Sequence, residues 1–258
     1  TKSNSEAVWL FTYNPLHMGG MQVFLQALVN QDTIVYSYKK EKNTTLKLIQ
    51  SESVTNISAT PTFYRLLFTP EVNYTTVKRI TLGGERADKK IFEDLQVMFP
   101  NAKLTNIYAT TETGATLFSK NDKFTVNKNI MIKNNVLFIK IKNNRWHNTG
   151  DMVEFMNESE FVFVGRNKKI INLGGRNVNP AQIEDLLRNN KAVRDAVIYV
   201  KSSSMLGNVL CADVVLCSPL SEQEIRAYLD EFVENYKIPR IINFKEVLTM
   251  SDNNKVVR

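Results

Sequence analysis

The stretch from Val77 to Thr113 decides the fold: VKRITLGGERADKKIFEDLQVMFPNAKLTNIYATTET. It begins with a strand-like run, Val77–Leu82, and passes through two glycines into a helical segment, Asp88–Phe99, whose apolar residues share one face. A second strand-like run, Leu104–Tyr108, follows. Strand–helix alternation of this kind predicts a largely parallel sheet covered by helices.

The same alternation extends upstream and covers the first 120 residues. Pro61 is a good first helical residue, because its missing N–H is not needed in the first turn of a helix. Predicted strands lie at Val8–Phe11, Thr33–Tyr36 and Val54–Ala59, and predicted helices at Met18–Val29 and Thr62–Phe68. The N-terminal part is therefore predicted to belong to the α/β class.

From Ala115 to Val164 the pattern changes to short alternating strands with asparagine-rich turns. Asn134-Asn135 lies between strand-like runs at Ile130–Lys133 and Val136–Lys142 and predicts a β-hairpin. This part of the chain is predicted to consist of strands and turns alone.

A third pattern begins after Arg166 and predicts a small α+β unit of about 90 residues. Asn179-Pro180 offers a cap and a first-turn proline for one helix, and Ser221–Glu224 is a capping box that opens another. The second helix is predicted to carry Ile225, Leu229, Phe232 and Tyr236 on one face, and strands are predicted at Val193–Val200, Leu210–Leu216 and Ile241–Val247.

The composition is that of an ordinary globular protein. Of 258 residues, 43% are hydrophobic and 23% are charged, which excludes disordered and fibrous classes. No run approaches the ~18 apolar residues that a membrane span needs. Cys211 and Cys217 are isolated, and the two histidines lie far apart, so a disulfide scaffold and a Cys- or His-based metal site are not expected. We expect a cytoplasmic protein without a membrane span.

The net charge of +7 is concentrated in one segment, residues 120–147, which has seven basic side chains and one acid, Asp122. Such a segment can face nucleic acid or a polyphosphate ligand. The alternative is a solvated polar face of short strands, because Lys133, Lys140 and Lys142 lie in alternating runs. Few aromatic residues interleave with the lysines, so we favour the solvated face.

Eight short motifs follow one another along the chain, and each of them alone is typical of an ordinary turn or strand end. The motifs are Pro15–Gly20, Ser58–Phe63, Gly83–Glu85, Tyr108–Thr113, Trp146–Asp151, Gly165–Ile171, Gly174–Glu184 and Asn253–Arg258. Their order and spacing carry more information than any one of them.

In that order, the motifs resemble those of the AMP-forming acyl-adenylate superfamily, which contains acyl-CoA synthetases, luciferases and peptide-synthetase adenylation domains. The resemblance implies an α/β fold, namely the C-terminal portion of the family's large α/β and β-barrel-like domain, followed by a small α+β C-terminal domain. On this basis residues 1–165 are a truncated large, adenylate-binding domain, residues 166–168 are a hinge, and residues 169–258 are a small mobile domain.

The resemblance also implies a reaction. The family activates a carboxylic acid by attack of its carboxylate on the α-phosphate of ATP, which releases pyrophosphate, and a thiol then displaces AMP from the acyl-adenylate. The implied ligands are ATP or AMP, Mg²⁺, and coenzyme A or the phosphopantetheine of a carrier protein. The form of the Gly174–Pro180 motif looks more like that of acyl-CoA synthetases than that of peptide-synthetase domains.

Roles for single residues follow from the resemblance. Thr111 is expected to bind the α-phosphate, and Glu112 to hold Mg²⁺, which prefers carboxylate and phosphate oxygens. Tyr108 is expected to stack on adenine, and Asp151 to accept hydrogen bonds from both ribose hydroxyls, with support from Arg166. The nucleotide-binding set is completed by Gly83, Gly84, Glu85, Arg86 and Ala109.

Other expected roles concern the acyl group and the thiol step. Lys255 is expected to bridge the acyl carboxylate and the α-phosphate, although alone it would be an ordinary lysine of a polar tail. Lys168 matches the hinge position, and Gly174 and Gly175 match the loop that replaces Lys255 at the active site for thiolation. His17 is expected to line the acyl pocket, or else to be a hydrogen-bonded histidine at a helix start.

The sequence departs from the family pattern in one important way. Members carry a Ser/Thr/Gly-rich phosphate loop before the Pro15–Gly20 motif, and no such loop is present here, although it would cradle the outer phosphates. We therefore expect the chain to be the C-terminal half of an AMP-forming acid–thiol ligase that needs a missing N-terminal half. The alternatives are a non-catalytic adenylate-binding or interaction protein and, third, a nucleic-acid binder acting through residues 120–147.

Overall fold

The computed structural model describes residues 7–110, 114–141, 144–166, 170–173, 176–203 and 207–250. Of these, the residues up to Phe124, together with Met250, form one compact unit, and Thr125–Thr249 form a second. The domain boundaries expected from the resemblance, with a hinge at residues 166–168, stay a prediction. None of the helices in the described ranges is long and apolar enough to cross a membrane.

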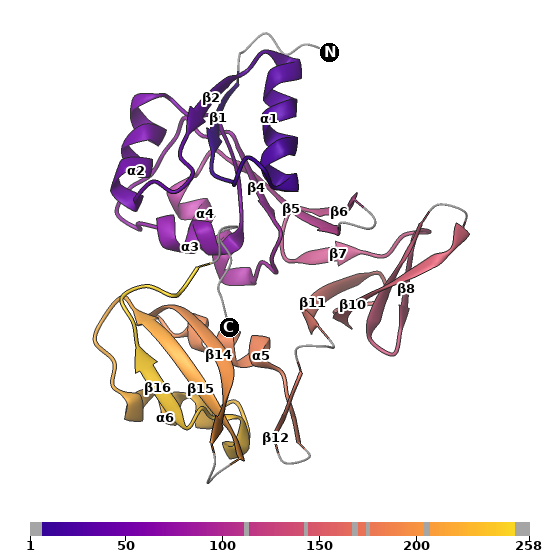
Figure 1. The fold of residues 1–258 in the computed structure, drawn as a ribbon, viewed down its shortest axis with the longest axis vertical. Coiled ribbons are helices and arrows are strands. Elements are labelled where there is room, and N and C mark those ends of the chain that lie inside the picture. The colour runs from indigo at the N-terminus through magenta and orange to yellow at the C-terminus, as the bar shows by residue number, and fades with distance from the viewer. Residues whose placement is uncertain are drawn as a thin grey trace. The chain divides into compact units, whose positions relative to one another are not determined.

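The first unit contains a six-stranded sheet in the order β2-β1-β3-β4-β5-β6 (Figure 1). The strands are β1 (Val8–Phe11), β2 (Thr33–Tyr36), β3 (Asn56–Ala59), β4 (Arg79–Gly83), β5 (Lys103–Thr110) and β6 (Gly114–Ser119). Strands β1 to β5 are parallel, and β6 runs antiparallel to β5. The predicted parallel sheet is therefore confirmed.

Helices cover both faces of this sheet, but unequally (Figure 1). The helices are α1 (Met18–Asn30), α2 (Lys42–Ser51), α3 (Pro61–Leu67) and α4 (Lys89–Met98). The main core joins α2, α3 and α4 to one face, where Ile49, Tyr64 and Leu95 pack with Leu10 and Ile80. On the other face α1 packs against β1 and β2 in a small cluster of Trp9, Phe11, Val23 and Ala27.

Capping residues set the start of two of these helices. The Thr60 hydroxyl accepts a hydrogen bond from the Phe63 N–H at 3.1 Å, and the Asp88 carboxylate accepts one from the Ile91 N–H at 3.0 Å. Asp88 also forms a 2.6 Å ion pair with Arg65 of α3, and both side chains are about nine-tenths buried. The pair therefore ties the start of α4 to α3, next to the turn that follows β4.

Helix α2 is absent from the sequence-based expectations. Its N-cap position, Glu41, makes no side-chain capping bond, so no local start signal precedes it. The helix is held by tertiary contacts instead: Ile49 is fully buried, and the Thr45 and Ser37 hydroxyls lie 2.8 Å apart.

A five-stranded sheet follows in the order β7-β11-β10-β9-β8, and its strands from β8 to β11 belong to the second unit. Its strands are β7 (Lys123–Thr125), β8 (Ile130–Lys133), β9 (Val136–Lys140), β10 (Trp146–Phe155) and β11 (Glu160–Arg166). Asn134 and Asn135 connect β8 to β9 with φ values of 51° and 60°. Positive φ at both turn residues is the geometry of a type I′ hairpin, so the predicted hairpin is confirmed.

The rest of the second unit is the expected α+β block. Its elements are β12 (Ile171–Leu173), β13 (Arg176–Val178), α5 (Pro180–Asn189), β14 (Val193–Ser203), β15 (Gly207–Leu216), α6 (Glu222–Asp230), the 3-10 helix η3 (Asn235–Lys237) and β16 (Ile241–Phe244). Ile183 and Leu187 of α5 and Ile225 and Leu229 of α6 pack on a sheet in the order β14-β15-β16. Both predicted caps are present, at Asn179 and at the Ser221–Glu224 capping box.

Two boundaries in this block differ from the expectation. Helix α6 ends at Asp230, so Phe232 and Tyr236 lie beyond it, and Phe232 is exposed. The final strand ends at Phe244 rather than Val247. The apolar spacing from Ile225 to Tyr236 therefore reflects one helix followed by a separate 3-10 turn, η3, that packs beside it.

Candidate functional site

The carboxyl edge of the parallel sheet gathers four segments of the chain, three of which belong to the motifs. Strands β1, β3, β4 and β5 are parallel neighbours, so the residues that follow them lie along one edge. These are Thr12-Tyr13, Thr60, Gly84-Glu85 and the Tyr108–Thr110 end of β5. In open α/β sheets, ligands bind in the crevice outside the carboxyl ends of the strands.

The turn after β4 is fastened to the start of α3. Gly84 has φ of 82°, a conformation that glycine adopts without strain. The Glu85 carboxylate accepts hydrogen bonds from the Thr62 hydroxyl at 2.6 Å and from the Thr62 N–H at 3.2 Å. The side chain of Glu85 is thus engaged with α3, and the turn exposes the backbone of Gly84. The role of Thr62 was not expected from the sequence, because the contact joins residues 23 positions apart.

Tyr13, at the end of β1, belongs to the same polar group. The pKa of its phenol is raised to about 12, mainly by burial; a hydrogen bond with the Ser58 side chain lowers it and the negative charge of Glu85 raises it, both by less than burial does. The phenol is therefore neutral near pH 7 and links the ends of β1 and β3. Nothing in the spacing of Tyr13 alone marked it as a site residue.

The Pro15–Gly20 motif forms the approach to α1. A Cβ at Gly20 would lie 2.2 Å from the backbone oxygen of Asn14, so only glycine lets the helix begin this close to the preceding loop. His17 occupies the N-cap position of α1, is exposed, and makes no side-chain capping bond. Its expected place in an acyl pocket stays a prediction.

A backbone irregularity marks the Tyr108–Thr113 motif. The pairing of β5 with β6 shifts register between Tyr108 and Ala109, and Ala109 is exposed while Tyr108 is half-buried. A register shift of this kind re-aims the side chains that follow it. It lies at the carboxyl end of β5, immediately before the predicted phosphate-binding residues.

In the second unit, Asp151 and Arg166 form an ion pair. They are direct partners on the antiparallel strands β10 and β11, and the Asp151 carboxylate accepts a hydrogen bond from the Arg166 Nε at 2.7 Å. The Asp151 side chain is only 8% exposed, whereas that of Arg166 is 58% exposed. The structure thus brings together two residues that the resemblance placed on one ribose.

The backbone before Asp151 bulges out of the sheet. The register of β10 against β9 shifts between Asn148 and Met152, and Gly150 has φ of 70°. Side chains hold the bulge: the Thr149 hydroxyl donates to the Leu137 carbonyl at 2.8 Å and accepts from the Asp151 N–H at 3.1 Å. The turn-like motif therefore sits inside a strand, where it fixes the direction of Asp151.

Several expected site residues lie outside the described ranges. They are Thr111, Glu112, Lys168, Gly174, Gly175 and Lys255. The residues on either side of Gly174 and Gly175, Leu173 and Arg176, are paired in an antiparallel β-hairpin. Among the described residues, no group of three His, Cys, Asp or Glu side chains could hold a metal ion.

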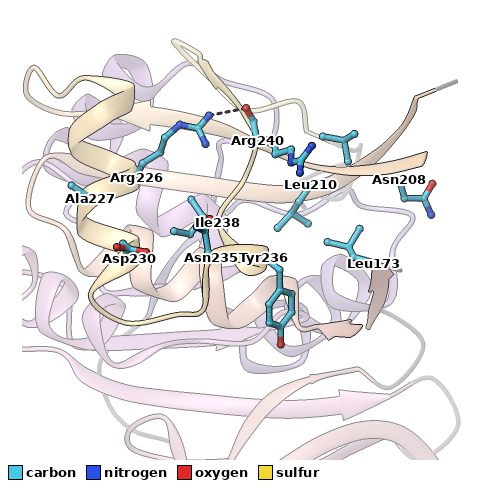
Figure 2. Close-up of a pocket in the computed structure, with 11 residues that line it drawn as sticks. Leu173, Asn208, Leu210, Arg226, Ala227, Asp230, Asn235, Tyr236, Ile238 and Arg240 are labelled. Carbon is cyan, nitrogen blue, oxygen red and sulfur yellow. Dashed lines mark hydrogen bonds between the residues drawn. The ribbon is translucent and has the colours of Figure 1, made fainter. Parts of the chain in front are cut away.

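The second unit also contains a cavity of about 730 Å³ between β15, α6 and η3, lined by none of the expected site residues (Figure 2). One wall is built by Arg226, whose guanidinium donates to the Pro239 and Arg240 carbonyls at 2.6 and 2.7 Å. At the rim, the Tyr236 ring lies 4.9 Å from the Arg176 guanidinium. Through these two hydrogen bonds Arg226 holds the loop that precedes β16.

Comparison with known families decides the classification. The model of the family described as AMP-binding enzyme matches residues 1–142, more than half of the chain. The chain belongs to the AMP-binding enzyme family. This family match covers the whole carboxyl edge described above, from Thr12 to Thr110.

Curated relatives of this AMP-binding chain include the 2-succinylbenzoate–CoA ligases of Staphylococcus aureus and Oceanobacillus iheyensis. Both are 25% identical and match 97% of this chain, but only 57% and 60% of their own lengths are covered. The chain thus spans less than two thirds of these relatives.

Solved structures show the same arrangement at lower identity. The o-succinylbenzoate CoA synthetase of Bacillus subtilis, in complex with its acyl-adenylate intermediate, is 22% identical with a TM-score of 0.71 and is covered to 60%. A benzoate CoA ligase from Burkholderia xenovorans is 18% identical with a TM-score of 0.77, also covered to 60%. These likenesses establish the fold: an α/β chain that aligns to part of adenylate-forming enzymes.

Proposed function

We propose that this chain carries the adenylate-binding part of an ATP-dependent, AMP-forming acid–thiol ligase of the acyl-CoA synthetase type. A carboxylate oxygen of the acid attacks the α-phosphorus of ATP, the bond to the β-phosphate breaks, and pyrophosphate leaves. The thiol sulfur of coenzyme A or of a carrier protein then attacks the acyl carbon, and AMP leaves. Because two anions meet in the first step, alignment and charge neutralisation carry the catalysis.

The observation that carries this proposal is the carboxyl edge of the sheet in a chain of the AMP-binding family. There the exposed backbone of Gly84 and the half-buried ring of Tyr108 end neighbouring strands, β4 and β5, in register. We assign adenine to the space between the Gly84–Arg86 backbone and Tyr108, with Gly83 and Ala109 flanking it. Glycine permits close approach of the base on one side.

In the second unit, we assign the ribose hydroxyls to Asp151. A carboxylate accepts two hydrogen bonds at once, and Asp151 is buried and aimed by the bulge before it. Arg166 donates a hydrogen bond to this carboxylate and holds it in place. The exposed part of Arg166 leaves its remaining N–H groups able to reach a ligand.

The remaining roles rest on the resemblance. Thr111 binds the α-phosphate, and Lys255 bridges it to the acyl carboxylate. Lys168 is the hinge, and Gly174-Gly175 enters for the thiol step. Mg²⁺, held by Glu112, would neutralise phosphate charge when bound.

Pyrophosphate exchange into ATP tests the proposed reaction, with 2-succinylbenzoate and benzoate as the first acids because the relatives act on them. In the complete enzyme we expect acid-dependent exchange, which Lys255→Ala abolishes and Lys245→Ala, at an exposed position in the loop after β16, leaves intact. Normal exchange by Lys255→Ala contradicts the assignment.

A second candidate function is adenylate binding without turnover. It is favoured by the described residues of the site, Gly84, Tyr108 and Asp151, all of which are assigned to the adenosine part of the nucleotide. Tight AMP binding by the chain, without exchange for any acid tested and without a partner polypeptide, supports this candidate over the first.

A further inference from the structure

The cavity between β15, α6 and η3 has the size and the lining of a small-molecule site. Its volume of about 730 Å³ lies within the ~300–1,000 Å³ that such sites occupy. Leu173, Leu210 and Ile238 supply apolar surface, and charged and amide side chains supply the rest. All the residues that line it lie in the second unit, apart from the carboxyl edge of the first.

One of the two arginines that line the cavity is fully engaged by the protein. Arg226 donates from Nη1 to the Pro239 carbonyl at 2.6 Å and from Nη2 to the Arg240 carbonyl at 2.7 Å. Its Nε donates to the Glu222 carboxylate at 3.2 Å, and the two side chains form an ion pair. The charge of Arg226 is therefore neutralised, and all three of its nitrogens have partners.

The other arginine, Arg240, is held by its backbone alone. Its N–H donates to the Leu210 carbonyl at 2.9 Å, and its carbonyl accepts from Arg226. Its side chain is exposed and extends toward Leu210 (Figure 2), and its guanidinium forms no ion pair or hydrogen bond with a residue of the described ranges. The cavity thus offers an available cation next to an apolar wall.

The β12–β13 hairpin contributes to the same end of the cavity. Leu173 of β12 lines it, and the Arg176 guanidinium of β13 lies 4.9 Å from the ring of Tyr236, a further lining residue from η3. Arg176 brings a second positive charge to the rim. A ligand that contacts Leu173 and Tyr236 would therefore brace the hairpin against η3.

The far end of the cavity has the opposite charge. Asp230 lies at the side away from Leu173 and Asn208 (Figure 2). It is the last residue of α6, whose last turn contains no basic side chain, so the carboxylate and the helix dipole are both negative there. A ligand with one negative charge suits this arrangement, whereas a second negative charge near Asp230 would be repelled.

We infer that this cavity binds a small organic anion with one negative charge and an apolar, aromatic body. The anionic group pairs with Arg240, whose planar guanidinium can donate two hydrogen bonds to a carboxylate. The body packs on Leu173 and Leu210. The inference concerns a site separate from the proposed adenylate site and does not rest on the proposed reaction.

Calorimetric titration of the intact chain with naphthalene-2-carboxylate tests this site, and naphthalene-2-carboxamide is the uncharged counterpart. We expect the carboxylate to bind about tenfold more tightly than the amide, because the amide lacks the charge that Arg240 recognises. Hydrogen exchange locates the binding: the carboxylate should slow exchange in β12–β13 and in residues 226–240, because ligand contacts suppress local opening.

Three substitutions probe the charges of the cavity. Arg240→Gln should weaken binding of the carboxylate about tenfold and leave binding of the amide unchanged. Asp230→Asn should strengthen binding of the carboxylate a few-fold, because a repelling charge is removed. Arg194→Gln, at an exposed arginine of β14 outside the cavity, is the matched control and should change neither affinity. Circular dichroism of each variant establishes that it is folded.

The inference is overturned by equal affinities for the carboxylate and the amide, or by an Arg240→Gln variant that binds the carboxylate as tightly as the wild type. Slowed exchange confined to the first unit would also overturn it, since the anion would then occupy a different site. An unchanged or lower affinity of Asp230→Asn contradicts the proposed orientation. None of these readouts depends on adenylation, so failure of the exchange assay and failure of this site are distinguishable.

Discussion

The carboxyl edge of the first unit and the Asp151 region of the second differ in what they offer a ligand. At the carboxyl edge, the surface proposed to face the ligand consists of main-chain atoms, which are positioned by Gly84 and by the Thr62–Glu85 contact. Around Asp151 it is one buried carboxylate, positioned by a bulge and by Arg166. A surface made of backbone tolerates changes of side chain, whereas a surface made of one charge depends on that residue. The two regions should therefore respond differently to mutation.

The largest effect is expected at Asp151. Asp151→Ala removes the carboxylate assigned to the ribose, and charge-assisted hydrogen bonds are strong, so AMP affinity should fall by about 3 kcal/mol, roughly a hundredfold in Kd. The fold should persist, because Arg166 is 58% exposed and remains solvated without its partner. Calorimetric titration measures the change. Glu154→Ala, an exposed acid on the same strand, is the control, and equal affinity for both variants contradicts the role of Asp151.

A smaller effect is expected at Thr62. Thr62→Val keeps the shape but removes the hydroxyl that donates to Glu85, which loosens the turn after β4. The cost should be about 1–2 kcal/mol in AMP affinity. Thr62→Ser restores a hydroxyl and should restore affinity. If valine and serine variants bind AMP equally well, the hydroxyl has no part in positioning this turn.

Gly84 tests the backbone character of the carboxyl edge. Gly84→Ala forces a side chain into φ of 82° and should lower the free energy of unfolding by about 1 kcal/mol. Gly83→Ala is the matched control, because a Cβ there would meet the Ile107 oxygen at an ordinary 3.7 Å. Urea denaturation of both variants makes the comparison, and equal stabilities would show that the turn does not require glycine.

The smallest effect near neutral pH is expected at Tyr13. Its pKa of about 12 in the folded chain exceeds its ordinary value of 10.0, so the folded state holds the proton more tightly than the unfolded state. The resulting stabilisation is fully present below pH 10 and is lost as the pH rises toward 12. Tyr13→Phe removes this component, so its stability should fall less than that of the wild type over the same range. If the free energies of unfolding of Tyr13→Phe and of the wild type fall equally as the pH rises, the raised pKa of Tyr13 makes no contribution to stability.

The sequence predicted those features that depend on neighbours in the chain. The caps at Asn179 and Ser221 and the turn at Asn134-Asn135 each need only a few adjacent residues, and all three are present. Helix α2 was missed, because no cap precedes it and its burial comes from distant residues. Helix α6 was extended too far, since apolar spacing alone does not reveal where a helix stops.

The same distinction between neighbouring and distant residues holds in the candidate site. The resemblance placed Asp151 and Arg166 on one ribose, and the structure pairs the two side chains, while the ribose role itself stays a prediction. The Thr62–Glu85 and Tyr13–Ser58 contacts join residues far apart in sequence and become visible only when strand order is known. The periodicity of Met18–Val29 predicted a helix correctly, but it gave no sign that apolar side chains such as Leu25 and Leu28 remain exposed on it.

The central claim is that this chain recognises the ribose of an adenylate through Asp151. Calorimetric titration of the intact chain with AMP and with 2′-deoxy-AMP tests it most directly. We predict one AMP per chain, with 2′-deoxy-AMP binding about tenfold more weakly because one hydrogen bond to the carboxylate is lost. Asp151→Asn should narrow this difference. Equal affinity for the two nucleotides, or no binding of either, would contradict the claim.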